Sequence, residues 1–106
     1  SCLFIYPRKE WDALIEHLNN LPLTQSNSRA FSRFMLAGAI EADIDKQGRI
    51  LIPDYLRKFA SLNKKLVIAG VNNRLEIWDE NLWNEYRTKT ERDVNEIAEK
   101  LIDFGI

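Results

Sequence analysis

The chain has 106 residues, of which 45% are hydrophobic and 29% are charged, as expected of one globular domain rather than a disordered tail. Its formal net charge of −1 gives no overall argument for a polyanionic partner. The only cysteine, Cys2, excludes an intramolecular disulfide, and with His17 as the only histidine a zinc knuckle is not expected. No apolar run approaches the roughly 20 residues that span a bilayer. We therefore expect a soluble, cytoplasmic protein without a metal, another cofactor, a membrane contact or a small-molecule substrate.

The first third of the chain predicts a short strand and two helices. The strand covers residues 3–5, and the first helix covers about residues 9–19. Apolar residues recur along this helix with helical spacing, at Trp11, Leu14, Ile15 and Leu18. A second helix should follow with Thr24 or Ser26 as its N-cap and end near Gly38.

The middle of the chain predicts a hairpin followed by a short helix. From residue 39 to residue 45 the apolar residues alternate with polar ones, as in a half-buried strand, with Ile40, Ala42 and Ile44 on one side. Residues 46–48 should form the turn, and residues 49–52 the returning strand, with Ile50 and Ile52 facing the core. Pro53 ends this strand because it lacks a backbone N–H, and Asp54 is placed to cap or open a short helix over residues 55–60.

The last third predicts two more strands and a long helix. The strands cover residues 65–71 and 74–78, and they are joined by Asn72 and Asn73, which tolerate the left-handed backbone of tight hairpin turns. Asp79 should cap the helix that follows. The apolar stripe of this helix consists of Leu82, Trp83, Tyr86, Val94, Ile97, Leu101 and Phe104.

The charge is unevenly distributed along the chain. Between residues 46 and 74 there are seven basic residues and one acid, Asp54, which gives a local charge of +6. The basic residues are Lys46, Arg49, Arg57, Lys58, Lys64, Lys65 and Arg74. This pattern indicates a surface that faces a polyanion, and scattered solubilising charge is the alternative. An enzyme is not expected, because no nucleophile and base, metal cluster or glycine-rich phosphate loop occurs at a usable spacing.

An internal repeat relates the two ends of the chain. Residues 2–11 match residues 74–83 at a constant offset of 72, and each copy is a strand that ends in an aromatic residue and leads into a helix with tryptophan. The matched pairs are Leu3 with Leu75, Ile5 with Ile77, Tyr6 with Trp78, and Trp11 with Trp83. The repeat implies that the chain begins inside a first copy. We expect residues 1–38 to be the end of a first repeat, residues 39–86 a complete second repeat, and residues 87–106 a helical tail.

The run DKQGRILIP, from Asp45 to Pro53, resembles the DxxxR signature of the MraZ family of bacterial transcription regulators. Three further segments are similar to that family, namely LPLT (21–24), SRFMLAGAIEADID (32–45) and AGVNNRLEIWDENLW (69–83). The resemblance covers about residues 2–86. Ordered matching over this length is much more specific than a lone DxxxR, which is common in charged hairpins.

The resemblance implies an α+β fold of the SpoVT/AbrB-like type, a swapped-hairpin or double-psi-type small β-barrel with flanking helices. In it the second repeat is complete and the first is truncated, so that the first DxxxR is missing. Members of the family form closed homo-oligomeric rings and bind tandem short repeats in promoter DNA upstream of the division and cell-wall gene cluster. The resemblance thus implies a sequence-specific, nucleoid-associated transcription regulator that binds double-stranded DNA.

The resemblance also implies a site in the turn, formed by Asp45, Lys46, Gly48 and Arg49. Asp45 would orient Arg49, which would contact a phosphate or the O6 and N7 of a guanine. Lys46 would contact phosphate, and Gly48 would permit the turn. The alternative is a solvent-exposed ion pair that contributes only about 0–1 kcal/mol to stability.

Other interpretations stay open. An AbrB-like, antitoxin-type module would use the tail, residues 90–106, to bind a partner protein. Arg57 and Lys58 would either border the DNA surface or form a solvated side of a helix. His17 is expected on the solvated side of its helix. The tryptophans occupy core or interface positions by their periodicity, rather than a base-stacking platform.

Overall fold

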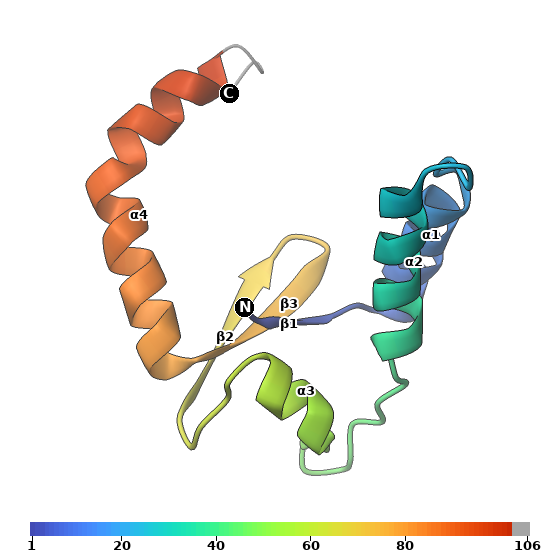
Figure 1. Ribbon diagram of the computed structural model, residues 1–106. Coiled ribbons are helices and arrows are strands. Elements are labelled where there is room, and N and C mark those ends of the chain that lie inside the picture. The colour runs from blue at the N-terminus through green and yellow to red at the C-terminus, as the bar shows by residue number, and fades with distance from the viewer. Residues whose placement is uncertain (103–106) are drawn as a thin grey trace.

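The computed structural model describes residues 1–102, and in this part of the chain helices and strands form one mixed arrangement (Figure 1). The elements in chain order are β1 (Leu3–Ile5), α1 (Arg8–Asn19), α2 (Ser26–Gly38), α3 (Asp54–Phe59), β2 (Leu66–Val71), β3 (Arg74–Asp79) and α4 (Glu80–Leu101). The predicted α+β class is confirmed. None of the helices in residues 1–102 is both long and apolar enough to cross a bilayer.

The three strands form one antiparallel sheet in the order β1-β3-β2. The β2–β3 hairpin is closed by Asn72, whose φ of 57° lies in the left-handed region that short polar residues tolerate. On the other side of β3, the strand β1 pairs with Leu3 opposite Ile77 and Ile5 opposite Leu75. The first and last thirds of the chain therefore meet in the centre of the sheet.

The small core lies between one face of the sheet and α3. Leu3, Ala60 and Ile77 are the buried members, with 9%, 0% and 3% of their surface exposed. Half-buried residues pack around them, namely Ile5, Ile50, Ile52, Leu56 and Leu62. The expectation that Ile50 and Ile52 face the core is confirmed, since both belong to this cluster.

The opposite face of the sheet carries aromatic side chains. At the start of α4, the ring of Trp78 lies 5.5 Å from that of Trp83 and 5.0 Å from that of Tyr86, measured between centroids. Near α1, the rings of Tyr6 and Trp11 are 6.1 Å apart. Each group joins a strand to the helix that follows it, so the predicted packing role of the tryptophans agrees with these contacts.

Most predicted elements are confirmed, within one or two residues at their ends. Gly38 is the last residue of α2, Asp54 is the first residue of α3, and Asp79 caps α4 by accepting a hydrogen bond from the Leu82 N–H at 3.3 Å. The predicted N-cap of α2 was wrong, because Gln25 occupies that position and makes no side-chain cap. Phe104, the last member of the predicted stripe, lies outside the described residues.

The predicted strands at residues 39–45 and 49–52 were wrong. Both segments lack regular secondary structure, although they meet at the predicted turn. The reason is that a strand needs a partner, and beyond the turn no backbone ladder joins the two arms in residues 1–102. Apolar side chains consequently stay exposed there, with Ile44 at 71% and Leu51 at 87%.

Candidate nucleic-acid interface

Residues 45–49 form a tight, closed turn, called here the 45–49 turn. The Asp45 N–H donates to the Arg49 carbonyl at 2.9 Å, and the Gly48 N–H donates to the Asp45 carbonyl at 3.0 Å. Gly48 has a φ of +78°, a conformation that side chains rarely adopt, and an added Cβ would meet no atom within 4 Å. The backbone angle, rather than lack of space, is therefore the reason for glycine here.

The Asp45 carboxylate organises this turn. Its Oδ1 accepts from the backbone N–H groups of Gln47 at 2.9 Å and Arg49 at 2.8 Å, and its Oδ2 accepts from Arg49 Nε at 3.1 Å. These donors stabilise the charged form and lower the pKa of Asp45, with the backbone N–H of Arg49 as the largest cause. Asp45 therefore fixes both the backbone of the turn and the direction of the arginine.

The guanidinium of Arg49 faces solvent. Its side chain is 72% exposed and that of Asp45 is 46% exposed. Only Nε is bound to Asp45, and neither Nη atom hydrogen-bonds to any residue between 1 and 102. Lys46 is also exposed beside it. The turn can therefore present the two Nη groups as a fork to an anionic or carbonyl partner, the geometry that bidentate recognition requires.

The segment that carries the turn is tied to the helices at both ends. Arg8, at the start of α1, forms an ion pair with Glu41, and this contact raises the pKa of Arg8. The Tyr55 hydroxyl donates to the carbonyl of Gly38, at the end of α2, at 2.8 Å. The sequence analysis missed both contacts. No local sequence pattern predicts either contact, because the two partners lie far apart along the chain in both pairs, Arg8 with Glu41 and Gly38 with Tyr55.

A wide apolar cleft of 1140 Å³ lies between these tethers. It is lined by residues from β1, the end of α2, both arms of the turn and α3, among them Leu3, Ile5, Phe34, Ile40, Ile52 and Leu56. Residues 1–102 contain no group of three or more His, Cys, Asp or Glu that could hold a metal ion.

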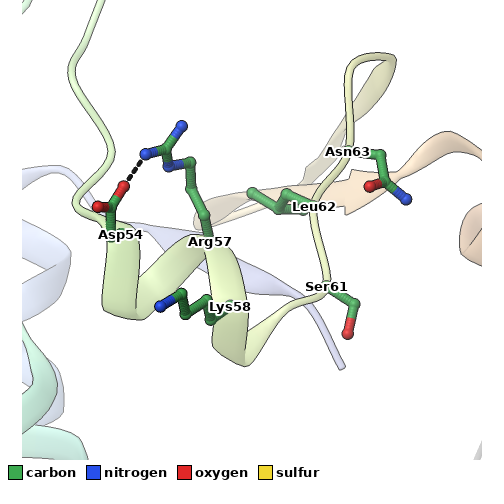
Figure 2. Close-up of a pocket in the computed structure, with 6 residues that line it drawn as sticks. All are labelled: Asp54, Arg57, Lys58, Ser61, Leu62 and Asn63. Carbon is green, nitrogen blue, oxygen red and sulfur yellow. Dashed lines mark ion pairs between the residues drawn. The ribbon is translucent and has the colours of Figure 1, made fainter.

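Two further predicted basic residues, Arg57 and Lys58, lie around a shallow pocket formed by α3 and the loop that follows it (Figure 2). The pocket has a volume of 390 Å³ and is lined by Asp54, Arg57, Lys58, Ser61, Leu62 and Asn63. Arg57 forms an ion pair with Asp54 one turn earlier, as the dashed line in Figure 2 marks. The charge of Arg57 is thus partly neutralised within α3, which agrees better with a solvated helix side than with a dedicated phosphate site.

Arg74 does not belong to an exposed basic surface. It donates from Nη2 to Glu76 at 3.0 Å, and its guanidinium carbon lies 4.6 Å from the centre of the Phe4 ring. Glu76 also accepts from the indole N–H of Trp78 at 3.1 Å. The sequence analysis missed Glu76, although alternate residues 74, 76 and 78 of a strand share one face. The charge of +6 counted between residues 46 and 74 therefore overstates the positive charge that is exposed to a polyanion.

Comparison with known proteins supplies the class of this molecule. The model of the family described as "MraZ protein, putative antitoxin-like" matches residues 1–34 and 35–105. The chain thus has an α+β fold with an exposed charged turn and the sequence of a transcription-regulator family. It belongs to the MraZ family.

Individual relatives agree with this. The transcriptional regulator MraZ of Natranaerobius thermophilus is 50% identical over 106 residues, which are 100% of this chain and 74% of the relative. The protein of the same name from Pediococcus pentosaceus is 51% identical over the same shares of both chains. That of Carboxydothermus hydrogenoformans is 48% identical over 97% of this chain and 72% of the relative. These names describe regulators, in agreement with the prediction that the chain is not an enzyme.

Proposed function

We propose that this chain is a sequence-specific DNA-binding regulator that contacts promoter DNA through the 45–49 turn. The observation that carries the proposal is the arrangement of Arg49, whose Nε is held by Asp45 while its Nη groups face solvent. A guanidinium held in this way loses little side-chain entropy when it binds, and its fork fits the O6 and N7 of guanine or a phosphate. Lys46 and Gly48 complete the site, as a phosphate contact and as the residue that permits the turn.

A single turn of this kind makes few contacts with DNA. Because each neutralised phosphate adds only a modest, salt-dependent amount to affinity, several turns must act together. We therefore propose a homo-oligomer that presents its turns to tandem repeats upstream of the division and cell-wall gene cluster. The site of action would be the cytoplasm, on the nucleoid.

The pairing of β1 with β3 supports the proposed double repeat. At the offset of 72, Leu3 corresponds to Leu75 and Ile5 to Ile77, and the observed partners are Leu3 with Ile77 and Ile5 with Leu75. Exchanging the two strands therefore leaves the register unchanged, as a local two-fold axis requires. The helices obey the same offset, since α1 begins at Arg8 and α4 at Glu80.

The burial of these residues is unequal, and this favours the proposed AbrB-like barrel. Leu3 is 9% exposed, whereas its counterpart Leu75 is 42% exposed, and Ile68, which pairs with Ile77 from β2, is 64% exposed. Ala60 and Ile50 pack in one cluster with Leu3 and Ile77, whereas Leu75 and Ile68 lie outside this cluster. A second turn-and-helix unit, equivalent to residues 39–65, would cover the other side. We retain the division into residues 1–38, 39–86 and 87–106 on this basis.

The test is the affinity of Arg49→Ala for a promoter fragment in a gel-shift titration at moderate salt. We expect a loss of about 5- to 150-fold and a less steep salt dependence, because one bidentate contact is worth about 1–3 kcal/mol. Arg92→Ala is the matched control, since it removes the same charge from the exposed part of α4. Equal affinity of Arg49→Ala and the wild type, with unchanged circular dichroism, would refute the proposal.

A second candidate function is an antitoxin-type module that binds a protein through residues 90–106. The exposed far end of α4 and the wording of the family description favour it. Deleting residues 90–106 distinguishes the two functions. Under the first proposal each chain keeps its DNA contacts, whereas under the second the deletion abolishes capture of the partner.

A further inference from the structure

The loop that carries the 45–49 turn consists of residues 39–53, between the end of α2 and the start of α3. Its two arms are held in different ways. The arm after the turn is anchored by packing, because Ile50 and Ile52 belong to the cluster around the core. In the arm before the turn, residues 39–44, no backbone group hydrogen-bonds to another backbone group in residues 1–102. Side-chain contacts must therefore hold this first arm in place.

A contact between α2 and α3 closes the base of the loop. The Tyr55 hydroxyl donates to the Gly38 carbonyl at 2.8 Å, and the rings of Phe34 and Phe59 lie 5.4 Å apart. The contacting residues are spaced by four within each helix, so both contacts lie on one face of α2 and one face of α3. The Gly38 carbonyl lies at the end of a helix, where no later N–H of the helix reaches it. Tyr55 supplies the donor that this carbonyl lacks.

The attachment of the first arm matters for the geometry of the turn. A loop that is attached through one arm can swing about that arm, whereas attachment of both arms fixes its direction. Arg49 begins the anchored arm, and Asp45, which holds the Arg49 guanidinium, ends the other arm. Glu41 also ties the first arm to Arg8, but both side chains are largely exposed, so this ion pair adds little. The contact of Tyr55 is therefore the attachment that we consider decisive.

We propose that Tyr55 is a positioning residue for the DNA contact: by closing the base of the loop, it fixes the direction in which the 45–49 turn presents Arg49. This inference rests on the function proposed above. A bidentate contact with a guanine edge needs its donors in a fixed direction, whereas attraction to phosphate tolerates movement of the cation. Loss of the Tyr55 hydroxyl should consequently weaken binding to the promoter sequence more than binding to unrelated DNA.

The first test compares Tyr55→Phe with the wild type in gel-shift titrations on a promoter fragment and on a scrambled fragment of the same length. We expect the affinity for the promoter to fall by about 2- to 12-fold, which corresponds to one net hydrogen bond. The affinity for the scrambled fragment should not change, because every charge that meets phosphate is retained. An equal loss on both fragments, or no loss on either, contradicts the positioning role.

Tyr86→Phe is the matched control. It removes a hydroxyl from a second helical tyrosine of similar exposure, whose ring packs on Trp78 at the start of α4. We expect this variant to bind both fragments as the wild type does. A loss of promoter affinity as large as that of Tyr55→Phe would show that the effect does not come from the base of the loop, and would overturn the inference.

A measurement without DNA separates this inference from the proposed function. In a Cys2→Ser background, spin labels on Gln47→Cys and Asn81→Cys report the distance from the turn to the start of α4 by double electron–electron resonance. Doubly labelled chains are diluted with unlabelled chain, so that distances within one copy dominate. Tyr55→Phe should broaden the distance distribution, and Tyr86→Phe should leave it unchanged.

The two proposals then fail in different ways. An unchanged distribution in Tyr55→Phe contradicts the positioning role, even where Arg49→Ala weakens DNA binding and so supports the function. A broadened distribution together with full DNA affinity of Arg49→Ala supports the closure of the loop by Tyr55 and refutes the proposed function.

Discussion

The molecule contains two arginine–carboxylate pairs of nearly equal length in very different surroundings. Arg49 lies 3.1 Å from Asp45, with side chains that are 72% and 46% exposed. Arg74 lies 3.0 Å from Glu76, with side chains that are 26% and 13% exposed. The first pair stands on a turn in solvent, and the second lies on the sheet beneath the Phe4 ring. The bond length alone therefore does not say what either pair does.

The surroundings assign different roles to the two pairs. In the sheet, Arg74 Nε is buried without a hydrogen-bond partner among the described residues, and the remaining donors are directed at Asn73 and Glu76. Each nitrogen of this guanidinium is therefore either hydrogen-bonded within the chain or buried. In the turn, the pair adds little to stability because solvent screens it, yet it holds a charged fork in a fixed direction. We therefore expect the Arg74–Glu76 pair to contribute to the free energy of unfolding, and the Arg49–Asp45 pair to contribute to the affinity for DNA.

The largest effect should follow from Glu76→Ala. This change removes the acceptor of Arg74 and of the Trp78 indole, and it leaves a half-buried cation without its counter-charge. We expect the free energy of unfolding in urea to fall by about 1–3 kcal/mol. Glu76→Gln should cost less, since the amide oxygen still accepts from Trp78.

Glu91→Ala is the control for this measurement. It removes the carboxylate of an exposed ion pair in α4, 3.7 Å from Arg87, and should change the unfolding free energy by less than about 0.5 kcal/mol. If Glu76→Ala were as harmless as Glu91→Ala, the distinction between the two arginine pairs would fail.

A smaller effect, on binding rather than stability, should follow from Asp45→Asn. The amide oxygen can still accept from the Gln47 and Arg49 N–H groups, so the turn should persist. The charge that holds Arg49 Nε is lost, and the guanidinium becomes free to rotate. We expect the affinity for promoter DNA to fall by several-fold, or about 1 kcal/mol, while the unfolding free energy stays within about 0.5 kcal/mol of the wild type. A large loss of stability with unchanged DNA affinity would reverse the roles of the two pairs.

Much of the fold could be predicted because its signals are local. The β2–β3 hairpin follows from two apolar runs around Asn72, and α4 begins at the Asp79 cap. The segment of residues 39–45 alternates as a strand should, yet it forms none, because pairing depends on a partner that no local pattern encodes. Alternation along a segment shows that it could pair, not that a partner is present.

The candidate site could be predicted from the sequence to a similar extent. The spacing of Asp45 and Arg49 and the glycine between them indicated a closed turn with an ion pair, and both are present. The tether of Tyr55 to Gly38 was not predictable, because it joins distant elements. Arg74 was counted with the basic surface, since sequence alone does not show which cations are covered by the sheet. A count of charges along the sequence therefore describes the surface charge only once the fold shows which of the charged side chains are exposed.

The smallest expected effect concerns the pKa of Asp45 in the Arg49→Ala variant. The backbone N–H of residue 49 is the largest cause of the lowered pKa, and alanine keeps that group. Because the pKa is lower in the folded than in the unfolded state, the contribution of Asp45 to stability is complete above the ordinary aspartate pKa and is lost as the pH falls through the folded value. An NMR titration of the Asp45 side-chain carbon should therefore show a midpoint below the ordinary value in both proteins, and only slightly higher in Arg49→Ala. A return to the ordinary value in the variant would mean that the side chain of Arg49, rather than the backbone of the turn, keeps Asp45 ionised.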